Sequence, residues 1–369
     1  MGPIIILDKS SLQSLSKDEI LVLNKYYMVN IVPVLAMEIL ADLKKGDDTD
    51  EARKKTVILS NKLLSSSLTV NTNFKDLIES SLMGHTVGMD GRPVLSGGQP
   101  VQTEDGRKGF IFKESLEEKA IMRWHENDFS KAEMFLADKW RETSKSIDLV
   151  EFKKELKKLN KNTPKLDSLE EVNNFIDKLL DDFGQQRKLL ELIICEFKLE
   201  NKNTPIFYNW TLNGELKIKD YAPYAYYCFK ISIFFNLALM NDLITERSTN
   251  RIDLQYLYYL PHCYVFSSGD NLHRSLVPFF LRSDQLFVDG NDLKKDLASI
   301  VSRRGFLDKK ELADWDDKYH LTPPDDNPCS LTLNLWKGFM AYDRVKGRKS
   351  KKKASKRIKK SHQEHLMKL

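Results

Sequence analysis

The 369-residue sequence contains no run of about 18 consecutive apolar residues, so it predicts no membrane-spanning helix. The longest apolar stretch, 221–240, is interrupted by Pro223, Lys230 and Asn236. The apolar residues at the start of the chain have no cationic flank and end at Asp8, so no signal peptide is expected. The four cysteines show neither CxxC pairing nor metal-ligand spacing, which is typical of a reducing, cytoplasmic environment.

Motifs that bind nucleotide phosphates are also missing from the sequence. Neither GxxxxGK[ST] nor GxGxxG occurs, which disfavours nucleotide hydrolysis. No Ser/His/Asp set stands in a recognisable local context, so nothing indicates a nucleophilic serine. No internal repeat is evident, so a repeat architecture is not expected.

Charge is distributed unevenly along the chain. The net charge is +5, but residues 344–369 hold 12 Lys and Arg and a single acid, so they carry +11 and residues 1–343 carry −6. Such a basic segment cannot form a core by itself and suits the phosphates of a nucleic acid. The alternative is a tail that serves only solubility.

Two segments near the N-terminus have the pattern of a buried strand followed by a helix. The β-branched run 3–7 ends at Asp8, and a helix is predicted over 17–26. A second short strand is predicted over 30–33, and a helix over 34–44 then carries Glu38 close to its start. Strands that alternate with helices in this way predict a parallel sheet.

The middle of the chain has a different composition. Residues 84–112 contain seven glycines and predict a loop with short hairpins at 94–95 and 109–112. The pattern from 113 to about 200 is helical, and the Asn213-Gly214 pair predicts a small hairpin over 208–219. Helices are expected over 51–66, 73–83, 119–140, 149–159, 167–180, 185–199 and, fully buried, 224–243.

The stretch 250–270, NRIDLQYLYYLPHCYVFSSGD, contains two further acids near predicted element ends. Asp253 is predicted to be the N-cap of a helix that stops at Pro261, and a strand over 263–266 ends just before Asp270. Another strand and helix are predicted over 285–288 and 291–303. Because parallel strands place their carboxyl ends on one edge, we expect these acids to meet Asp8 and Glu38 there.

Four carboxylates at one edge would repel one another and raise each other's pKa values. A bound Mg²⁺ or Mn²⁺ removes this repulsion, because hard cations prefer oxygen ligands. Such a site can activate water for attack on a phosphodiester. Each acid also has a plainer interpretation: Asp8 and Asp253 as helix caps, Glu38 as a solvated helix residue and Asp270 as a turn residue.

In its order along the chain, this acidic set resembles the PIN-like domain family of metal-dependent nucleases. The run from Ile4 to Asp8 resembles the family's opening strand and aspartate, and VPVLAMEILADL resembles the segment with its glutamate. Asp253, the strand after it and Ser268-Gly269-Asp270 resemble the family's closing segment. The similarity covers roughly 1–45 and 246–300.

The resemblance implies an α/β fold, a three-layer α/β/α sandwich around a mostly parallel sheet. It implies that Asp8, Glu38, Asp253 and Asp270 bind Mg²⁺ or Mn²⁺, and that Ser10 and Ser268 hydrogen-bond within the site. A large, mainly helical insertion must then interrupt the fold. The expected parts are a core over 1–83, the insertion over 84–245, the second part of the core over 246–343 and the basic tail over 344–369.

Several basic residues are candidates for binding substrate. His273 and Arg274 follow Asp270 closely and are expected at the rim of the site, where they would contact a phosphate. Lys351, Lys352 and Lys353 belong to the basic tail and would contact the nucleic acid backbone. The alternative is that His273 packs inside the protein and that Arg274 and the three lysines are solvated cations.

These observations predict a metal-dependent endoribonuclease that cleaves phosphodiester bonds. The resemblance adds that many such nucleases act as toxins or in defence. The insertion is expected to shape substrate access or to bind a protein partner. One alternative is a PIN-like module that binds nucleic acid or protein without turnover. Another is a flap-type DNA nuclease, which is ranked lower because no helical arch or helix-hairpin-helix glycines are evident.

Overall fold

The computed structural model describes residues 2–45, 49–64, 69–102, 106–160, 163–181 and 184–340. The basic tail over 344–369, with Lys351, Lys352 and Lys353, lies outside these residues. Its predicted contact with nucleic acid therefore stays a prediction from charge alone.

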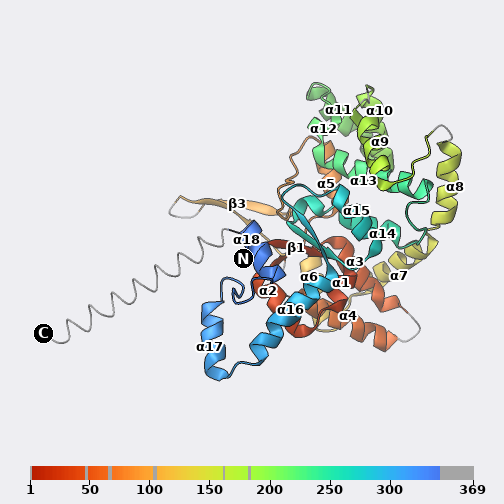
Figure 1. The fold of residues 1–369 in the computed structure, drawn as a ribbon. Helices are drawn as coiled ribbons and strands as arrows, with labels where there is room; N and C mark the ends of the chain where they lie inside the picture. Colours follow the sequence, from red (N-terminus) through yellow and green to blue (C-terminus); the bar gives the residue numbers. More distant parts are fainter. Residues whose placement is uncertain are drawn as a thin grey trace.

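A four-stranded parallel sheet lies at the centre of the molecule (Figure 1). Leu7 on its second strand is in register with Ser267, and Ser268 is in register with Asp289, so three strands end at the same edge. This confirms the predicted mixed α/β fold with a parallel sheet. In sheet order the strands are β2 (Met28–Val29), β1 (Ile4–Leu7), β5 (Val265–Ser268) and β6 (Leu286–Asp289).

Strands β1 and β5 are buried along nearly their whole length. In neither strand do apolar and polar residues alternate, which is the pattern of a sheet covered on both sides. The helices next in sequence to the strands are α1 (Lys9–Ser14), α2 (Lys17–Tyr26), α3 (Pro33–Ala41), α14 (Asn250–Leu257), α15 (Asn271–Leu276) and α16 (Gly290–Gly305). Among them, α16 packs on β5 and β6 and against α1 and α2.

The remaining helices pack against this central part and against one another. Helix α7 contacts α3, α6 contacts α4, and the buried helix α13 contacts α5, α9 and α14. Apolar residues of all these helices and of the sheet form one continuous core. The helices are α4 (Thr49–Leu63), α5 (Phe74–Leu82), α6 (Leu116–His125), α7 (Lys131–Ser146), α8 (Leu149–Leu159), α9 (Leu169–Asp181), α10 (Gln186–Glu196), α11 (Asn203–Leu212), α12 (Ile218–Tyr221) and α13 (Pro223–Met240).

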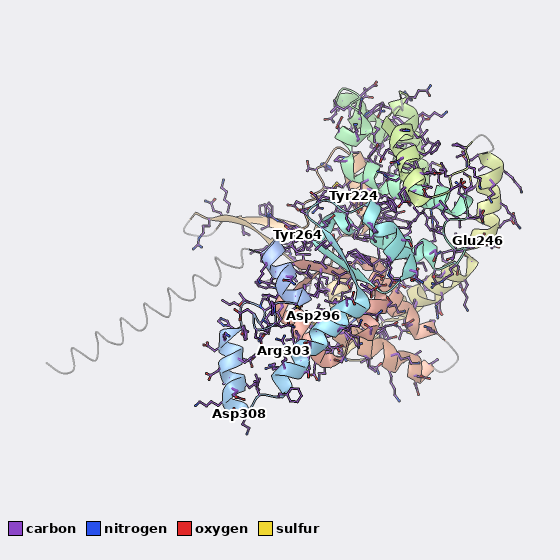
Figure 2. The ribbon with its side chains drawn as sticks, in the orientation of Figure 1. Tyr224, Glu246, Tyr264, Asp296, Arg303 and Asp308 are labelled. Carbon is purple, nitrogen blue, oxygen red and sulfur yellow. The ribbon has the colours of Figure 1, made fainter. Side chains whose placement is uncertain are left out.

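Two further helices complete the C-terminal part, α17 (Lys309–Lys318) and α18 (Leu331–Phe339). Asp296 of α16, labelled in Figure 2, binds the N-terminus of α18. Its carboxylate accepts hydrogen bonds from the backbone N–H groups of Leu331 and Thr332, each 2.9 Å long, and from the Thr332 hydroxyl at 2.6 Å. The Trp336 indole of α18 donates to the carbonyl of Tyr26 at 2.6 Å. The Asp296 carboxylate thus adds to the cap that Ser330 provides for α18, and it joins α16 to α18.

The predicted hairpin over 208–219 is wrong. Residues 203–212 form helix α11, and Gly214 with φ 75° follows its end. An Asn-Gly pair satisfies the left-handed conformation after a helix as well as that of a hairpin turn, so the local signal was ambiguous. The hairpin predicted at 94–95 is also wrong: the strands are β3 (Gly98–Gln102) and β4 (Lys108–Phe112), which confirm only the second hairpin segment.

The single helix predicted over 119–140 is two helices, α6 and α7. Ser115 and Ser130 each open one of them with a capping box, to Glu118 and Glu133 respectively. Both Ser-x-x-Glu signals stand in the sequence and mark the second start directly. The strand predicted over 30–33 lies earlier, at β2, because Pro33 already begins α3.

Candidate active site

The four predicted acids come from four elements around the carboxyl ends of β1 and β5. Asp8 follows β1 directly, and Asp270 follows β5 as the N-cap of α15. Glu38 lies on α3 and Asp253 on α14, and α14 packs against both α3 and α15. Strand β1 has β2 on one side and β5 on the other, and open α/β sheets form a crevice where such connections diverge.

One expectation about these acids is wrong. Asp253 is not the N-cap of its helix, because α14 begins at Asn250 after Thr249. Asp253 lies in the first turn instead, where a carboxylate still interacts favourably with the helix dipole. Its side chain is therefore not consumed by a capping hydrogen bond and remains available to the site.

Asp8 is buried and held by three hydrogen bonds. Its Oδ2 accepts from the hydroxyls of Ser10 and Ser268, both at 2.7 Å, and its Oδ1 accepts from the backbone N–H of Ser11 at 2.8 Å. Burial alone would raise the pKa of Asp8, but His273 and the hydrogen bonds from Ser11 and Ser10 lower it below its usual value. Asp8 is thus an ionised carboxylate in a fixed position, and Ser10 and Ser268 both hydrogen-bond to it.

His273 is fully buried, so the prediction that it contacts substrate phosphate is wrong. Its Nε2 lies 2.8 Å from the backbone carbonyl of Asp253, and its Nδ1 lies 2.8 Å from the Ser268 hydroxyl and 3.7 Å from Asp8 Oδ2. Burial would lower the pKa of His273, but Asp8 and Asp253 raise it above its usual value. Because Nε2 must donate to the carbonyl and Ser268 donates to Asp8, a proton on each ring nitrogen satisfies every contact.

Glu38 faces the same region from α3. The Tyr256 hydroxyl donates a hydrogen bond to its Oε2 at 2.5 Å. Burial raises the pKa of Glu38, and the charge of Asp8 adds to the rise. The neighbouring Lys9 does not contact this carboxylate, since its amine donates to the Glu38 backbone carbonyl at 3.1 Å and pairs with Asp42 at 2.8 Å.

Asp253 also has a raised pKa. Burial raises its pKa to about 7, and the charges of Glu38 and Asp270 contribute, although His273 and Arg247 oppose them. Asp270 caps Leu272 through Oδ1 at 2.7 Å, and its Oδ2 lies 3.7 Å from Arg247. The fold therefore brings all four acids close enough that each carboxylate affects the pKa of a neighbouring group.

This grouping is looser than a closed metal site. Among the residues that the structure describes, no three His, Cys, Asp or Glu side chains are arranged to hold a metal ion. The four carboxylates share one edge of the sheet and one electrostatic environment, but they do not converge on a point. What the arrangement offers chemically is a partly buried concentration of negative charge.

Arg274 lies at the rim of this edge and is about half exposed, and its contact with a phosphate stays a prediction. Its guanidinium is already engaged with Asp289, through Nε at 3.2 Å, and with Asn271 at 2.5 Å. The Arg274 guanidinium lowers the pKa of Asp289. Asp289 is the last residue of β6, and Asp8 directly follows β1. An aspartate at the end of an apolar strand was therefore the sequence signal that would have identified Asp289 as a third acid of this kind.

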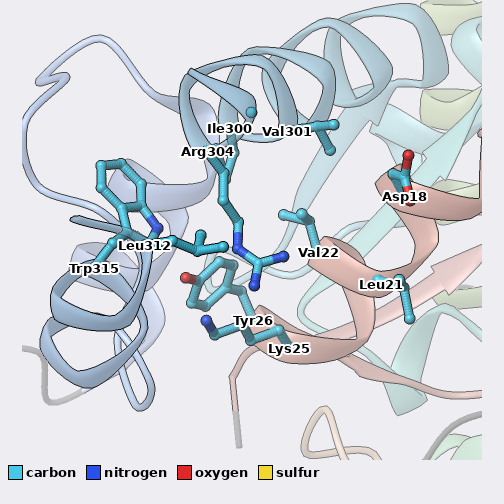
Figure 3. Close-up of a pocket in the computed structure, with 11 residues that line it drawn as sticks. Asp18, Leu21, Val22, Lys25, Tyr26, Ile300, Val301, Arg304, Leu312 and Trp315 are labelled. Atoms are coloured by element: carbon cyan, nitrogen blue, oxygen red, sulfur yellow. The ribbon is translucent and has the colours of Figure 1, made fainter. Parts of the chain in front are cut away.

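A surface pocket of about 520 Å³ lies elsewhere, between α2, α16 and α17 (Figure 3). Two of its lining residues, Lys25 and Arg304, form ion pairs with Asp316 of α17, at 3.1 Å and 2.7 Å. None of the four acids contributes to it. Its lining residues are Asp18, Leu21, Val22, Lys25, Tyr26, Ile300, Val301, Arg304, Gly305, Leu312 and Trp315.

No protein-family model matches this chain, and neither a search of curated proteins nor one of solved structures finds a similar protein. Within the described ranges, none of the helices has the length and apolar character needed to cross a bilayer. Because the comparisons find no similar protein, the site is interpreted from its own geometry.

Proposed function

We propose that this chain is a nuclease of the PIN-like type that depends on Mg²⁺ or Mn²⁺ and cleaves RNA. The observation that carries the proposal is the grouping of Asp8, Glu38, Asp253 and Asp270 at the carboxyl edge of the parallel sheet. Burial and the neighbouring acids raise the pKa values of Glu38 and Asp253 there, so the ionised carboxylates are held in this position at a cost in free energy. A divalent cation would offset that cost, because its charge stabilises the ionised carboxylates.

The donor chemistry of the four residues fits such an ion, since all four supply carboxylate oxygens. Asp8 is ionised and rigidly held, which suits a permanent ligand. Asp253 has a pKa of about 7, so a cation would displace its proton near neutral pH. Because the side chains do not yet form a closed set, ion binding requires Glu38, Asp253 and Asp270 to draw closer together.

The bound ion would supply activated water and neutralise charge on the phosphodiester. The protein's own residues position the reaction. Ser268 and His273 fix Asp8, Tyr256 orients Glu38, and Arg247 stands beside Asp270 at the rim, where it can bind a phosphate. Each of these contacts constrains a carboxylate or aims a cation toward the sheet edge.

The remaining parts of the proposal rest on the resemblance to PIN-like nucleases and on the positive charge of residues 344–369. The sheet with its flanking helices would form the three-layer core, and the helices over 84–245 would be an insertion that shapes access or binds a partner. The basic tail would bind RNA through its phosphates, in a cytoplasmic setting. A role as a toxin or in defence remains part of the proposal.

Cleavage by an Asp8→Asn variant tests the proposal. Labelled RNA, single-stranded DNA and duplex DNA are incubated with the full chain and Mn²⁺. Wild type is expected to cleave RNA fastest, and Asp8→Asn is expected to lose at least about 1,000-fold of the rate, as for loss of a central electrostatic group. Asn keeps the oxygen that accepts from Ser11 N–H, so circular dichroism should show an unchanged fold.

The matched control is Asp314→Asn, an exposed acid on α17, which should cleave like wild type. Cleavage by Asp8→Asn at the wild-type rate would exclude this site. Preference for flapped DNA over RNA would instead indicate a flap-type nuclease.

A second candidate is a PIN-like module that binds nucleic acid or protein without turnover. The observation that favours it is the absence, among the described residues, of a closed group of metal ligands. Isothermal titration with Mn²⁺ separates the two candidates. Binding that is lost in Asp253→Asn supports the nuclease, whereas RNA binding without any Mn²⁺ binding or cleavage supports the module.

A further inference from the structure

The hairpin of β3 and β4 projects from the body of the protein (Figure 1). Three consecutive large apolar residues lie on β4 with high exposure: Phe110 at 66%, Ile111 at 58% and Phe112 at 45%. A two-stranded hairpin is marginally stable in water by itself. In the described part of the chain its two strands pair only with each other, so the outer edge of β4 is open.

The hairpin has two distinct faces. Phe110 and Phe112 share one face, with ring centroids 6.4 Å apart, and Ile111 points to the other. The Phe112 ring lies close over Gly98 on the paired strand, where an added Cβ would come within 2.7 Å of it. The aromatic face is therefore ordered by its own hairpin and still exposed to solvent.

We propose that the open edge of β4 binds β4 of a second copy of this chain, in an antiparallel pair centred on Ile111. In this register Phe110 lies opposite Phe112 of the other copy, and Lys108 lies opposite Glu114. Both pairs occur twice, because a two-fold axis passes between the two Ile111 residues. Aromatic pairs and opposite charges across neighbouring strands are both stabilising.

Charge favours this register over its neighbours. A shift by one or two positions in one direction would place Lys108 or Arg107 opposite Lys113, and such like charges destabilise a strand pair. A shift by one or two positions in the other direction opposes no like charges, but it places Glu114 opposite Gly109 or Phe110 and so removes the pair with Lys108. The centred register instead places Lys113 opposite Gly109. In the centred alignment the segment 107–114 pairs Lys108 with Glu114 and Phe110 with Phe112, each twice, and such self-complementarity is what a homodimer requires.

Sedimentation of the full-length protein over a range of concentrations tests the proposal. Wild type is expected to form a reversible dimer. Lys108→Glu and Glu114→Lys should each weaken it about tenfold, because each creates two like-charge pairs. The double variant should restore the wild-type dissociation constant. Phe306→Asp, at a residue 86% exposed away from the hairpin, is the matched control and should dimerise like wild type.

Disulfide trapping gives a second measurement that does not depend on affinity. Cys195 and Cys329 are exposed, so both are first replaced by serine. Ile111→Cys should then form a covalent dimer on oxidation, since directly opposed residues in an antiparallel pair lie within disulfide reach. Gln99→Cys, which pairs with Ile111 inside the hairpin, should not.

A wild-type protein that stays monomeric at the highest concentration would overturn the proposal. So would a double variant no better than either single reversal, which would show that the pairing of Lys108 with Glu114 does not exist. Binding of RNA that is lost in Phe110→Ala and Phe112→Ala monomers would assign the face to nucleic acid instead.

Discussion

The Ser268 hydroxyl lies between the Asp8 carboxylate and the His273 imidazole. In a nucleophilic triad the histidine lies between the serine and the acid, so this order is different. Ser268 is also fully buried and accepts a hydrogen bond from the N–H of Asp270 at 2.9 Å. At the residue scale, these three side chains position a carboxylate and do not form a nucleophile.

Replacement of Asp253 by Asn should stabilise the metal-free protein at pH 8. The raised folded-state pKa of about 7 means that folding favours the protonated acid, so stability falls as pH rises from about 4 to about 7. The neutral amide avoids this loss, and urea denaturation at pH 8 should show a gain on the order of 3 kcal/mol. At pH 4 the gain should nearly vanish. A variant less stable than wild type at pH 8 would contradict this interpretation of the site.

His262 provides an independent test of pH dependence, away from the acids. It is fully buried between Tyr224 and Tyr259, and burial lowers its pKa to about 4. The folded state therefore binds fewer protons than the unfolded state between pH 4 and about 6.5, so stability falls as pH falls through that window.

His262→Phe keeps a ring at this position and should remove up to about 3 kcal/mol of that pH dependence. Stability of the two proteins is compared by denaturant titration from pH 4 to pH 7. Parallel curves for wild type and variant would show that His262 does not contribute.

Helix ends carry much of the polar bonding between elements. Several helices are capped by their own Ser or Asp, but α18 takes in addition the Asp296 side chain from α16 (Figure 2). These hydrogen bonds fix the position of α18 relative to α16. At the scale of elements, α18 depends on Asp296, a residue that lies outside its own sequence.

Asp296→Ala should therefore destabilise the protein by about 3 kcal/mol, because it leaves the N–H groups of Leu331 and Thr332 without their charged acceptor. Thermal unfolding measures the loss. Asp292→Ala, one turn earlier on the same helix and exposed, is the control and should change stability by less than about 0.5 kcal/mol. Equal effects of the two variants would show that the cap is not stabilising.

The whole molecule separates charge along its length. Residues 1–343 carry −6, whereas the tail over 344–369 carries +11. An acidic body repels a nucleic acid at long range, so association with RNA should depend on the tail. The proposed catalytic edge and the proposed source of affinity thus belong to different parts of the chain.

Removal of residues 344–369 should weaken RNA binding at least tenfold at about 0.1 M salt and reduce the salt slope, because fewer counterions are released. Fluorescence anisotropy across a salt titration measures both. Cleavage of a short RNA at saturating concentration should persist. Binding that is unchanged across the titration would show that the tail serves only solubility.

The sequence alone determined the parallel sheet and the order of its acids. Continuous apolar runs such as Ile4–Leu7 are local signals of buried strands, and an acid directly after a strand lies at the sheet edge. Asp8 and Asp270 could therefore be placed from neighbouring residues. Helix boundaries were predicted less accurately. The hairpin predicted over 208–219 was wrong, since an Asn-Gly pair suits more than one structure.

Only the tertiary structure decided the chemistry of the site. Ser268 contacts Asp8 across 260 positions, and Tyr256 contacts Glu38 across 218. Such contacts leave no periodic trace in the sequence, so neither the burial of His273 nor the pKa of Asp253 could be predicted. Burial and charge proximity depend on elements that folding brings together, because solvation and Coulomb energies depend on distance in space and not along the chain.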